Sequence, residues 1–409
     1  MRSAAWSGAT IFLAILASLI GGLALGGPLS TGQADPLFWA KAQAICMMAL
    51  AALVRWRRKQ GPGARAFSWQ MCAGAGSLSA IALFCGVSAS ALSLAAMFVL
   101  LAITVLALSA IWFLPRLKGF VCLLLLIGGV AGADMWMRKP APKSSSRPEL
   151  AILSALPIFG PAGELMGKHA PLIDRLALDF KIRPVDSVTA APLRQGGRLL
   201  VAHPRALPPA DLAFIDAWVR GGGTAVILAD PLLLWPMALP PGDRRRPPVT
   251  SLLDPLLSHW GLELLPSEGR GVERRFLSSG ALLPIAGASS FKTRGGCRLA
   301  EQGLFALCRI GKGRVRLIAD ADMADDRLWL ADPDHPLSPA SLSGDTPALL
   351  SDWLRDPMSS RPIPPSRPWI GNDAAMIEAM RWALLAGMAW AILGAGVVFV
   401  REKPGRHGK

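Results

Sequence analysis

The chain has 409 residues, 52% of them hydrophobic, with a mean hydropathy of +0.40 and a formal net charge of +15. It is too apolar to be wholly soluble and too long to be only a bundle of membrane helices. Residues 148–370 carry 25 Lys/Arg and 23 Asp/Glu, so nearly all of the positive excess lies outside them. There it acts as a signal for membrane topology, and we expect no nucleic-acid partner.

Six apolar segments are each long enough to cross a hydrocarbon core of roughly 30 Å. The stretch from Phe67 to Phe113 would span about 70 Å as one helix, so we divide it near Gly86–Ser90. Tryptophans lie close to the proposed ends, as an interfacial aromatic belt requires. The predicted spans are Ala9–Gly27, Phe38–Val54, Phe67–Val87, Leu92–Phe113, Gly119–Met137 and Met376–Val400.

The short loops predict the orientation. Lys and Arg crowd the second and fourth loops and the C-terminal tail, whereas the first and third loops hold almost none. Because basic short loops stay in the cytoplasm, both termini are expected there, in a bacterial inner membrane, with the large domain in the periplasm. A basic cluster before that domain points the other way, but long translocated domains obey the rule weakly.

Other features of the spans favour an anchor. The first span resembles a signal peptide in having Arg2 before it, but its long apolar core without a clean cleavage site favours an uncleaved helix. Small-xxx-small patterns at Gly22–Gly26 and Gly128–Gly132 permit close packing, within the chain or between copies. No Asp, Glu or His lies deep in a span, which disfavours an ion-coupled transporter.

Polar, Pro-rich chain fills the space between the fifth and sixth spans. The predicted divisions are a five-helix region 1–137, a tether 138–148, an α/β domain 149–356, a linker 357–375, a last span 376–400 and a basic tail 401–409. Apolar strands alternating with helices favour a parallel sheet covered on both faces. Predicted strands are Leu150–Leu156, Ile182–Val185, Arg198–Ala202, Thr224–Ala229, Leu262–Leu265 and Arg314–Ala319; predicted helices are Pro171–Phe180, Pro208–Val219 and Thr250–Trp260.

Part of this domain follows the pattern strand, Pro, helix ending in Gly-Gly, strand, Asp-Pro. The stretches are Leu199-Leu-Val-Ala-His-Pro, Leu207-Pro-Pro-Ala-Asp-Leu, Ile215-Asp-Ala-Trp-Val-Arg-Gly-Gly-Gly and Ala225-Val-Ile-Leu-Ala-Asp-Pro. The pattern resembles the extracytoplasmic domain of the gliding-motility-type ABC-transporter auxiliary proteins, over roughly residues 148–356. The resemblance implies a class I glutamine amidotransferase-like (flavodoxin-like) parallel sheet and an association with ABC-type export or envelope assembly.

No catalytic residue is predicted. An amidotransferase-type nucleophile needs a Cys on a sharp strand-to-helix turn, but strand Thr224–Ala229 runs into Asp230-Pro231, and neither Gly-x-Ser-x-Gly nor Gly-x-Cys-x-Gly occurs in the domain. The histidines lack metal spacing, so no metal and no cofactor is expected. No Walker sequence is present, so ATP hydrolysis would come from another chain.

Four polar residues that follow predicted strands are the candidate ligand-binding residues. His203 ends a buried strand, where α/β sheets place ligand sites, although a structural role before Pro204 is favoured. Asp230 is expected to be a helix cap or loop acid and not a catalytic carboxylate. Asp320 and Asp322 begin an acidic run that either offers oxygens to a hard cation or forms a solvated loop, and the solvated loop is favoured.

Two of the six cysteines are predicted to form a structural disulfide. A hairpin turn at Gln302-Gly303 places Cys297 directly opposite Cys308. Opposed residues of a ladder have Cα atoms about 5.5 Å apart, within disulfide range, and the predicted compartment is oxidising. The remaining cysteines are read as apolar packing residues of the spans: Cys46, Cys72, Cys85 and Cys122.

These features predict a non-enzymatic inner-membrane accessory protein whose periplasmic domain binds a partner protein or an envelope ligand. Its expected partners are membrane proteins, among them an ABC ATPase and permease, and the lipid bilayer. The alternative is a membrane-anchored envelope hydrolase or carbohydrate-binding enzyme that uses His203, Asp230 and the acidic loop. A transporter in its own right is disfavoured by the apolar interior of the spans.

Overall fold

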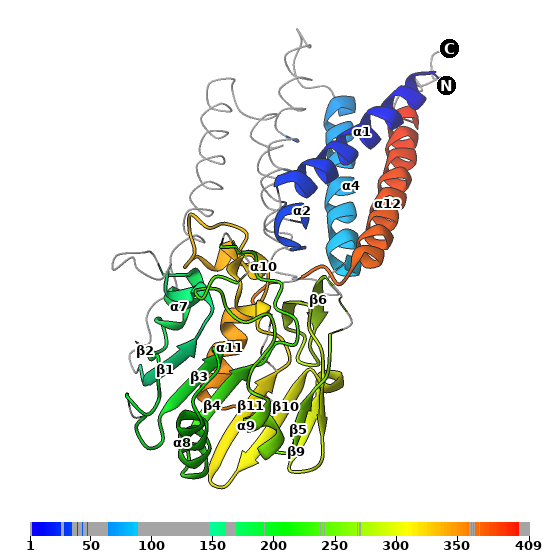
Figure 1. Ribbon diagram of the computed structural model, residues 1–409. Helices are drawn as coiled ribbons and strands as arrows, with labels where there is room; N and C mark the ends of the chain where they lie inside the picture. Colours follow the sequence, from blue (N-terminus) through cyan, green and yellow to red (C-terminus); the bar gives the residue numbers. More distant parts are fainter. Residues whose placement is uncertain are drawn as a thin grey trace, which may run out of the picture. The chain divides into compact units, whose positions relative to one another are not determined.

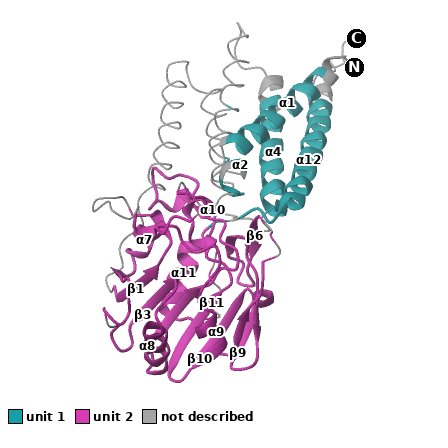
Figure 2. Ribbon diagram, in the orientation of Figure 1, with its two compact units in different colours: residues 1–137, 367–409 teal, residues 138–366 magenta. Residues whose placement is uncertain are grey.

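The computed structural model describes residues 2–25, 28–34, 39, 43, 47, 64–88, 147–160 and 169–400, except positions 192, 238, 241, 268, 270, 360, 362, 364 and 368. The chain divides into two compact units, unit 1 (residues 1–137 and 367–409) and unit 2 (residues 138–366), shown in Figure 2. Some predictions lie wholly or almost wholly outside the described residues: the spans Phe38–Val54, Leu92–Phe113 and Gly119–Met137, the pattern Gly128–Gly132, and Cys46 and Cys122.

The described part of unit 1 is helical (Figure 1). Its helices are α1 (Arg2–Leu25), α2 (Pro28–Thr31), α4 (Ala64–Ser88) and α12 (Asp373–Val400). Within the described residues, three stretches are long and apolar enough to cross a membrane: Trp6–Ala24, Trp69–Ser88 and Asp373–Val397. They fall on the first, third and sixth predicted spans, and they are consistent with a membrane protein.

Helices α1, α4 and α12 pack against one another. Their approach depends on small residues, because a Cβ added at Gly76 of α4 would lie 2.9 Å from the Cβ of Trp390 and would also clash with Ile15. Gly22 of α1 likewise faces the ring of Trp39, which leaves no room for a Cβ. At Gly22, the small-xxx-small pattern therefore serves packing within the chain.

Unit 2 is a mixed α/β structure built on a seven-stranded sheet (Figure 1). The sheet order is β2-β1-β3-β4-β11-β10-β9. The first five strands of that order are parallel, β10 pairs antiparallel with β11, and β9 pairs antiparallel with β10. The bounds are β1 (Glu149–Ser154), β2 (Lys181–Pro184), β3 (Arg198–Ala202), β4 (Thr224–Leu228), β9 (Cys297–Ala300), β10 (Phe305–Ile310) and β11 (Gly313–Ile318).

Helices cover both faces of this sheet. Helix α8 (Pro209–Arg220) begins with Pro at its first turn and ends before Gly221, as its sequence predicts. Helix α7 (Pro171–Leu176) contacts α11 (Thr346–Arg355). The chain passes from β1 through α7 to β2 in one direction along the sheet, and from β3 through α8 to β4 in the other. Because such crossovers are right-handed, α7 and α8 lie on opposite faces. The strands between these layers are almost continuously apolar and buried.

Three predicted elements differ from the structure. The helix predicted at Pro171–Phe180 is the shorter α7, which ends at Leu176. The helix predicted from Thr250 is the shorter α9 (Asp254–His259), because the proline after Asp254 sets the first helical turn. The strand predicted at Leu262–Leu265 is β5 (Leu262–Leu264), which pairs antiparallel with β8 (Phe291–Thr293) outside the seven-stranded sheet. A short apolar run does not reveal which strand it pairs with. The prediction that Leu262–Leu265 joins the parallel sheet was therefore wrong.

Smaller elements complete unit 2. Strands β6 (Val272–Phe276) and β7 (Leu282–Ala286) form an antiparallel hairpin. The remaining short helices are η1 (Pro157–Phe159), η2 (Glu301–Gly303), η3 (Asp322–Ala324), α10 (Asp326–Trp329) and η4 (Pro339–Ser341). The sheet is parallel-rich as predicted, whereas the likeness to glutamine amidotransferases stays a prediction.

Candidate functional site

The four predicted ligand-binding residues gather at one edge of the sheet. His203 follows β3, Asp230 follows β4, and Asp320 and Asp322 follow β11. Since these strands are parallel neighbours, their carboxyl ends meet at the same edge. All four side chains are buried, with at most 2% of any of them exposed.

His203 is held in a left-handed backbone conformation, with φ of 47°. Its main-chain N–H donates to the carbonyl of Leu228, and its Nε2 lies 2.8 Å from the carbonyl oxygen of Pro248. Because a carbonyl only accepts, Nε2 carries the proton. Burial lowers the pKa of His203, and no described group bonds its Nδ1. The ring therefore links the loop that contains Pro248 to the end of β3 by a hydrogen bond.

Asp230 bonds main-chain groups of two loops. Its Oδ1 accepts from the N–H of Leu232 at 2.8 Å, and its Oδ2 accepts from the N–H of Ala321 at 2.7 Å and of Asp322 at 3.3 Å. The predicted role as a loop acid matches these contacts. A carboxylate that accepts three N–H groups holds the loops after β4 and β11 together.

Asp320 and Asp322 also bond the main chain. Asp320 accepts from the N–H of Met323 at 2.6 Å and of Ala286 at 2.9 Å, which links the loop to β7. Asp322 accepts from the N–H of Leu234 at 2.7 Å through Oδ2, and its Oδ1 has no hydrogen-bond partner among the described residues. Strand β11 ends at Ile318, so the two carboxyls do not share one side of a continued strand.

The three carboxyl groups also interact electrostatically. Burial raises the pKa of Asp230, even though its hydrogen bonds and His203 oppose the rise. Burial and the charges of Asp230 and Asp322 raise the pKa of Asp320 well above its ordinary value. Burial, reinforced by the charges of Asp230 and Asp325, raises the pKa of Asp322 to about 7. At pH 7 Asp322 is therefore about half protonated.

The acidic run is not a solvated loop throughout, which corrects the favoured expectation for its first half. Asp325 is 4% exposed, caps α10 by accepting from the N–H of Arg327, and also pairs with the Arg327 side chain at 2.6 Å. Further on, Asp332 is half-buried and Asp334 is exposed. Among the described residues, no three His, Cys, Asp or Glu side chains are placed to hold a metal ion.

Two cavities, of about 200 Å³ and about 180 Å³, are lined by described residues of unit 2, and neither is lined by any of the four candidates. A hydrolase needs its acid, base and water to meet the substrate bond. The structure therefore brings together the residues that the hydrolase alternative names. Their side chains, however, are buried and hydrogen-bonded to the main chain.

Cys297 and Cys308 form a disulfide between β9 and β10, with Cα atoms 4.3 Å apart. The two residues are directly paired in the ladder, in the register that the turn at Gln302-Gly303 predicts. Glu301, Gln302 and Gly303 all have positive φ, and the ladder closes at Ala300 and Phe305, so four residues join the two strands. The Cα distance is shorter than expected and is typical of a non-hydrogen-bonded pair.

One buried arginine and one group of arginines were missed from the sequence. Arg316 of β11 is 5% exposed and packs against the rings of Phe305 and Trp353, with its guanidinium 5.6 Å and 4.7 Å from their centroids. It donates to the carbonyls of Pro357 and Ser359, and burial lowers its pKa to about 10. The only signal was a charged residue at an inward position of an apolar strand. The group of arginines lines the 200 Å³ cavity, where Gly196-Gly197 between two arginines was the available signal.

Residues 147–269 match the sequence model of a family described as an ABC-type uncharacterized transport system. No curated protein matches the chain. The match supports an ABC transporter auxiliary family, as the resemblance predicted, and it leaves the likeness to glutamine amidotransferases open.

Several solved structures are weakly similar. The exo-β-1,4-mannosidase Op5Man5 from Opitutaceae bacterium strain TAV5 has a TM-score of 0.30 and 11% identity, covering 57% of this chain and 39% of that chain. The GH42 β-galactosidase Gan42B from G. stearothermophilus has 0.28 and 14%, with coverages of 51% and 32%. The β-galactosidase from Rahnella sp. R3 has 0.26 and 15%, with coverages of 51% and 34%. The chain spans less than half of each enzyme, and similarity this weak carries no argument.

Proposed function

From the ABC transporter auxiliary family that residues 147–269 match, we propose that this chain is a non-enzymatic accessory protein of an ABC-type transport or envelope-assembly system in a bacterial inner membrane. Unit 2 is the part that binds a partner protein or an envelope ligand. The family match is the observation that carries this proposal. The ATPase is a separate chain, since the sequence holds no Walker motif.

The state of the carboxyl edge supports a binding role over a hydrolytic one. His203, Asp230 and Asp320 are each fully buried and bonded to main-chain groups. A general acid or base has to reach the substrate directly or through one water. These side chains instead hold the loops that follow β3, β4 and β11, and a fixed set of loops is what a docking surface requires.

The proposed topology places unit 2 in the periplasm and both termini in the cytoplasm. Three described helices of unit 1 are long and apolar enough to anchor the chain. The Cys297–Cys308 disulfide fits an oxidising compartment. Attachment on both sides of unit 2 in the sequence keeps it at the membrane, where a transporter partner would be met.

Site-specific photo-crosslinking in native membranes tests the partner. A photoreactive residue replaces Val272, which is 66% exposed on unit 2, and in a matched variant it replaces Ile392, which is 72% exposed on α12. We expect the unit 2 position to capture a component of an ABC system, identified by mass spectrometry. Recovery of no ATPase or permease from either position, with the chain correctly inserted, would contradict the proposal.

Cysteine accessibility tests the topology separately. Arg309→Cys places a thiol on the exposed side of β10, and Lys409→Cys places one at the C-terminus. In intact cells whose outer membrane is permeable to the reagent, a membrane-impermeant maleimide should label the first and not the second. The reverse labelling would overturn the orientation and leave the accessory role to be judged by crosslinking.

A further inference from the structure

A cavity of about 180 Å³ lies between helix α11 and the antiparallel end of the seven-stranded sheet. Its lining residues include Arg298 of β9, Leu307 of β10, Arg316 of β11, and Asp352 and Trp353 of α11. A water takes up about 30 Å³ in the liquid, so this volume corresponds to about six waters and suits a small organic group. Nothing in the proposed function uses this cavity.

The strand register puts two arginines on the same face of the sheet. Arg298 pairs with Leu307, and Leu307 pairs with Arg316, so the three side chains leave the sheet in the same direction. The ring of Trp353 lies 4.7 Å from the guanidinium of Arg316, so this is the face that α11 covers. Neighbouring strands are about 4.8 Å apart, which separates the Cα atoms of Arg298 and Arg316 by about 10 Å. Two side chains of that length can reach one group above Leu307.

Arg316 keeps one nitrogen free of the protein. Its Nε donates to the carbonyl of Pro357 at 2.8 Å, and its Nη2 donates to the carbonyl of Ser359 at 2.7 Å. Its Nη1 bonds no described residue, yet it is not sealed off from solvent, so it faces the cavity that Arg316 lines. Two carbonyls and an aromatic ring fix the rest of the guanidinium. Nη1 is therefore a donor that a ligand meets already in position.

The described residues that line the cavity carry one more positive than negative charge. They include three arginines and two carboxylates, namely Arg298, Arg316, Arg361, Glu301 and Asp352. Neither Arg298 nor Arg316 forms an ion pair with a carboxylate that the structure describes. Burial, and to a smaller extent the charge of Arg298, lower the pKa of Arg316 to about 10, although Asp352 opposes the change. The two guanidinium groups are thus close enough to repel each other.

The walls between these charges are apolar. Leu277, Phe305, Leu307, Leu349 and Trp353 line the cavity, and all five are buried. The rings of Phe305 and Trp353 meet edge to face, with their centroids 5.1 Å apart. Apolar walls with a few polar groups that fix orientation are typical of sites for small ligands. A molecule that fills this cavity therefore needs an apolar body and one negatively charged end.

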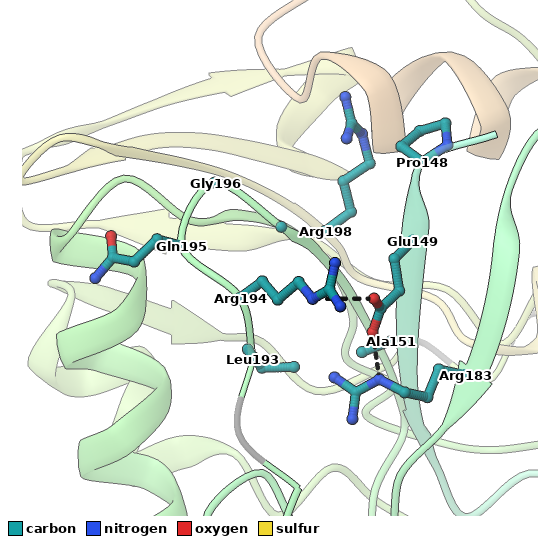
Figure 3. A pocket seen from close by; sticks show the side chains of 10 residues that line it. Pro148, Glu149, Ala151, Arg183, Leu193, Arg194, Gln195, Gly196 and Arg198 are labelled. Atoms are coloured by element: carbon teal, nitrogen blue, oxygen red, sulfur yellow. Dashed lines mark hydrogen bonds and ion pairs between the residues drawn. The ribbon is translucent and has the colours of Figure 1, made fainter. Parts of the chain in front are cut away.

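The larger cavity, of about 200 Å³, offers an anion less. Its carboxylate, Glu149, lies 2.5 Å from Nε of Arg183 through Oε1 and 3.6 Å from Nε of Arg194 through Oε2. Figure 3 shows both contacts, with the Arg198 side chain pointing away from them. Arg198 pairs with Leu150, the neighbour of Glu149 in β1, so its side chain lies on the other face of the sheet. Arg198 has no carboxylate partner among the described residues, but it does not share an anion with Arg194.

We propose that the 180 Å³ cavity binds a compact apolar carboxylate, which accepts hydrogen bonds from Arg298 and Arg316 and packs its body against Trp353. Bonds between guanidinium and carboxylate are about twice as strong as neutral ones. A single carboxylate cancels the surplus charge. A phosphate monoester, with about −1.5 to −2 charges at pH 7, exceeds it and would be repelled by Glu301 and Asp352.

The carboxylate belongs either to a free acid or to the last residue of a peptide. This site goes beyond the accessory role proposed above, and the two can fail independently. Crosslinking in native membranes tests the accessory role, and ligand binding tests the site.

The test uses the full chain in nanodiscs of zwitterionic lipid, with empty nanodiscs as the blank, and follows phenylacetate by ligand-observed NMR. Phenylacetate should bind, and uncharged phenylacetamide, which has the same body, should bind at least tenfold more weakly. Arg298→Gln should weaken the binding of phenylacetate at least fivefold. The matched control Arg294→Gln, which removes an exposed arginine outside the cavity, should change it less than twofold.

A second variant fills the cavity and leaves every arginine in place. Ala300→Phe adds a ring at a half-buried lining position of β9 and should weaken the binding of phenylacetate at least fivefold. Thermal unfolding without ligand checks that both variants fold. Phenylacetate should raise the melting temperature of the wild type and of Arg294→Gln, and not that of Ala300→Phe.

Two peptides resolve the source of the carboxylate. Tighter binding of acetyl-alanyl-phenylalanine than of phenylacetate, lost in the peptide amide, assigns the site to a peptide C-terminus, and equal or weaker binding assigns it to a free acid. The proposal is overturned if phenylacetate does not bind at millimolar concentration beyond the blank, or if phenylacetamide binds as tightly. It is also overturned if Arg298→Gln or Ala300→Phe binds phenylacetate as the wild type does.

Discussion

The carboxylate of Asp230 accepts a hydrogen bond at 2.7 Å from the main-chain N–H of Ala321, 91 residues further along the chain. One side chain thereby joins the loops that leave two adjacent parallel strands, β4 and β11. The same carboxylate also bonds the N–H of Leu232 in its own loop. Loop structure at this edge depends on buried carboxyl groups, and several consequences can be measured.

Asp230→Asn should destabilise unit 2. An amide has one accepting oxygen, whereas both carboxylate oxygens of Asp230 accept from main-chain N–H groups, so one buried donor loses its partner at a cost of about 1–3 kcal/mol. Thermal unfolding of the full chain, followed by near-ultraviolet circular dichroism, measures the change. Asp243→Asn, at an exposed turn, is the matched control and should have a smaller effect. Equal melting temperatures for wild type and Asp230→Asn would show that the hydrogen bonds of the Asp230 carboxylate contribute no stability.

Stability should fall as pH rises toward neutrality because of Asp322. Its pKa is about 7 in the folded chain and near 3.8 in the unfolded chain, so between these values the folded state holds a proton that the unfolded state has lost. Between these two pKa values, a difference of one proton makes the unfolding free energy fall by about 1.4 kcal/mol for each unit that the pH rises. Above the higher pKa the unfolding free energy stops falling.

Asp322→Asn should remove this contribution, since the amide mimics the protonated acid and its oxygen can still accept from Leu234. The difference in stability between variant and wild type should therefore grow in favour of the variant from pH 5 to pH 7.5. Burial also lowers the pKa of His203, but His203 is present in both proteins and its contribution cancels in the comparison. A difference that does not vary with pH would contradict a raised pKa at Asp322.

The Cys297–Cys308 bond should stabilise unit 2 by about 3 kcal/mol, because it closes a short loop in the unfolded chain. Replacing both residues with Ala should lower the melting temperature, and a reductant should destabilise the wild type alone. Non-reducing peptide mapping of the chain from native membranes should give one linked peptide. Two free thiols there would refute the bond and weaken the periplasmic placement of unit 2.

Gly76→Val should disrupt the packing of unit 1. An added Cβ at that position would lie 2.9 Å from the Cβ of Trp390 and would overlap Ile15. Overpacking of this kind typically costs about 1–3 kcal/mol. Gly396→Val is the matched control, because nothing lies within 4 Å of a Cβ added there. The melting temperature in detergent should fall for the first variant only, and equal losses would indicate a general intolerance to valine in these helices.

Local patterns located the five parallel strands of the sheet and helices α7, α8 and α9. The strand predicted at Arg198–Ala202 has the observed bounds, since a continuous apolar run between turn residues leaves little choice. Helix α8 was bounded by Pro209 and Gly221 for the same kind of reason. The strand at Leu262 was assigned to the wrong sheet, because the choice between a parallel neighbour and β8 depends on contacts far along the chain.

The candidate site shows a similar division. The sequence alone located His203, Asp230 and Asp320 after parallel strands, and strand order then brought them to one edge. Nothing local revealed that these side chains would be buried and bonded to main-chain N–H groups, or that Arg198 would be left without an anion.

The sequence by itself determined the apolar helices, the alternation of strands and helices, and the register that sets Cys297 opposite Cys308. All of these depend on residues close together in the chain, where helix and strand periods and turn chemistry act. Only the tertiary structure decided which carboxyl groups lose water and which arginines lack partners. Burial and charge pairing are properties of the assembled fold, because they sum the contributions of groups that the sequence holds far apart.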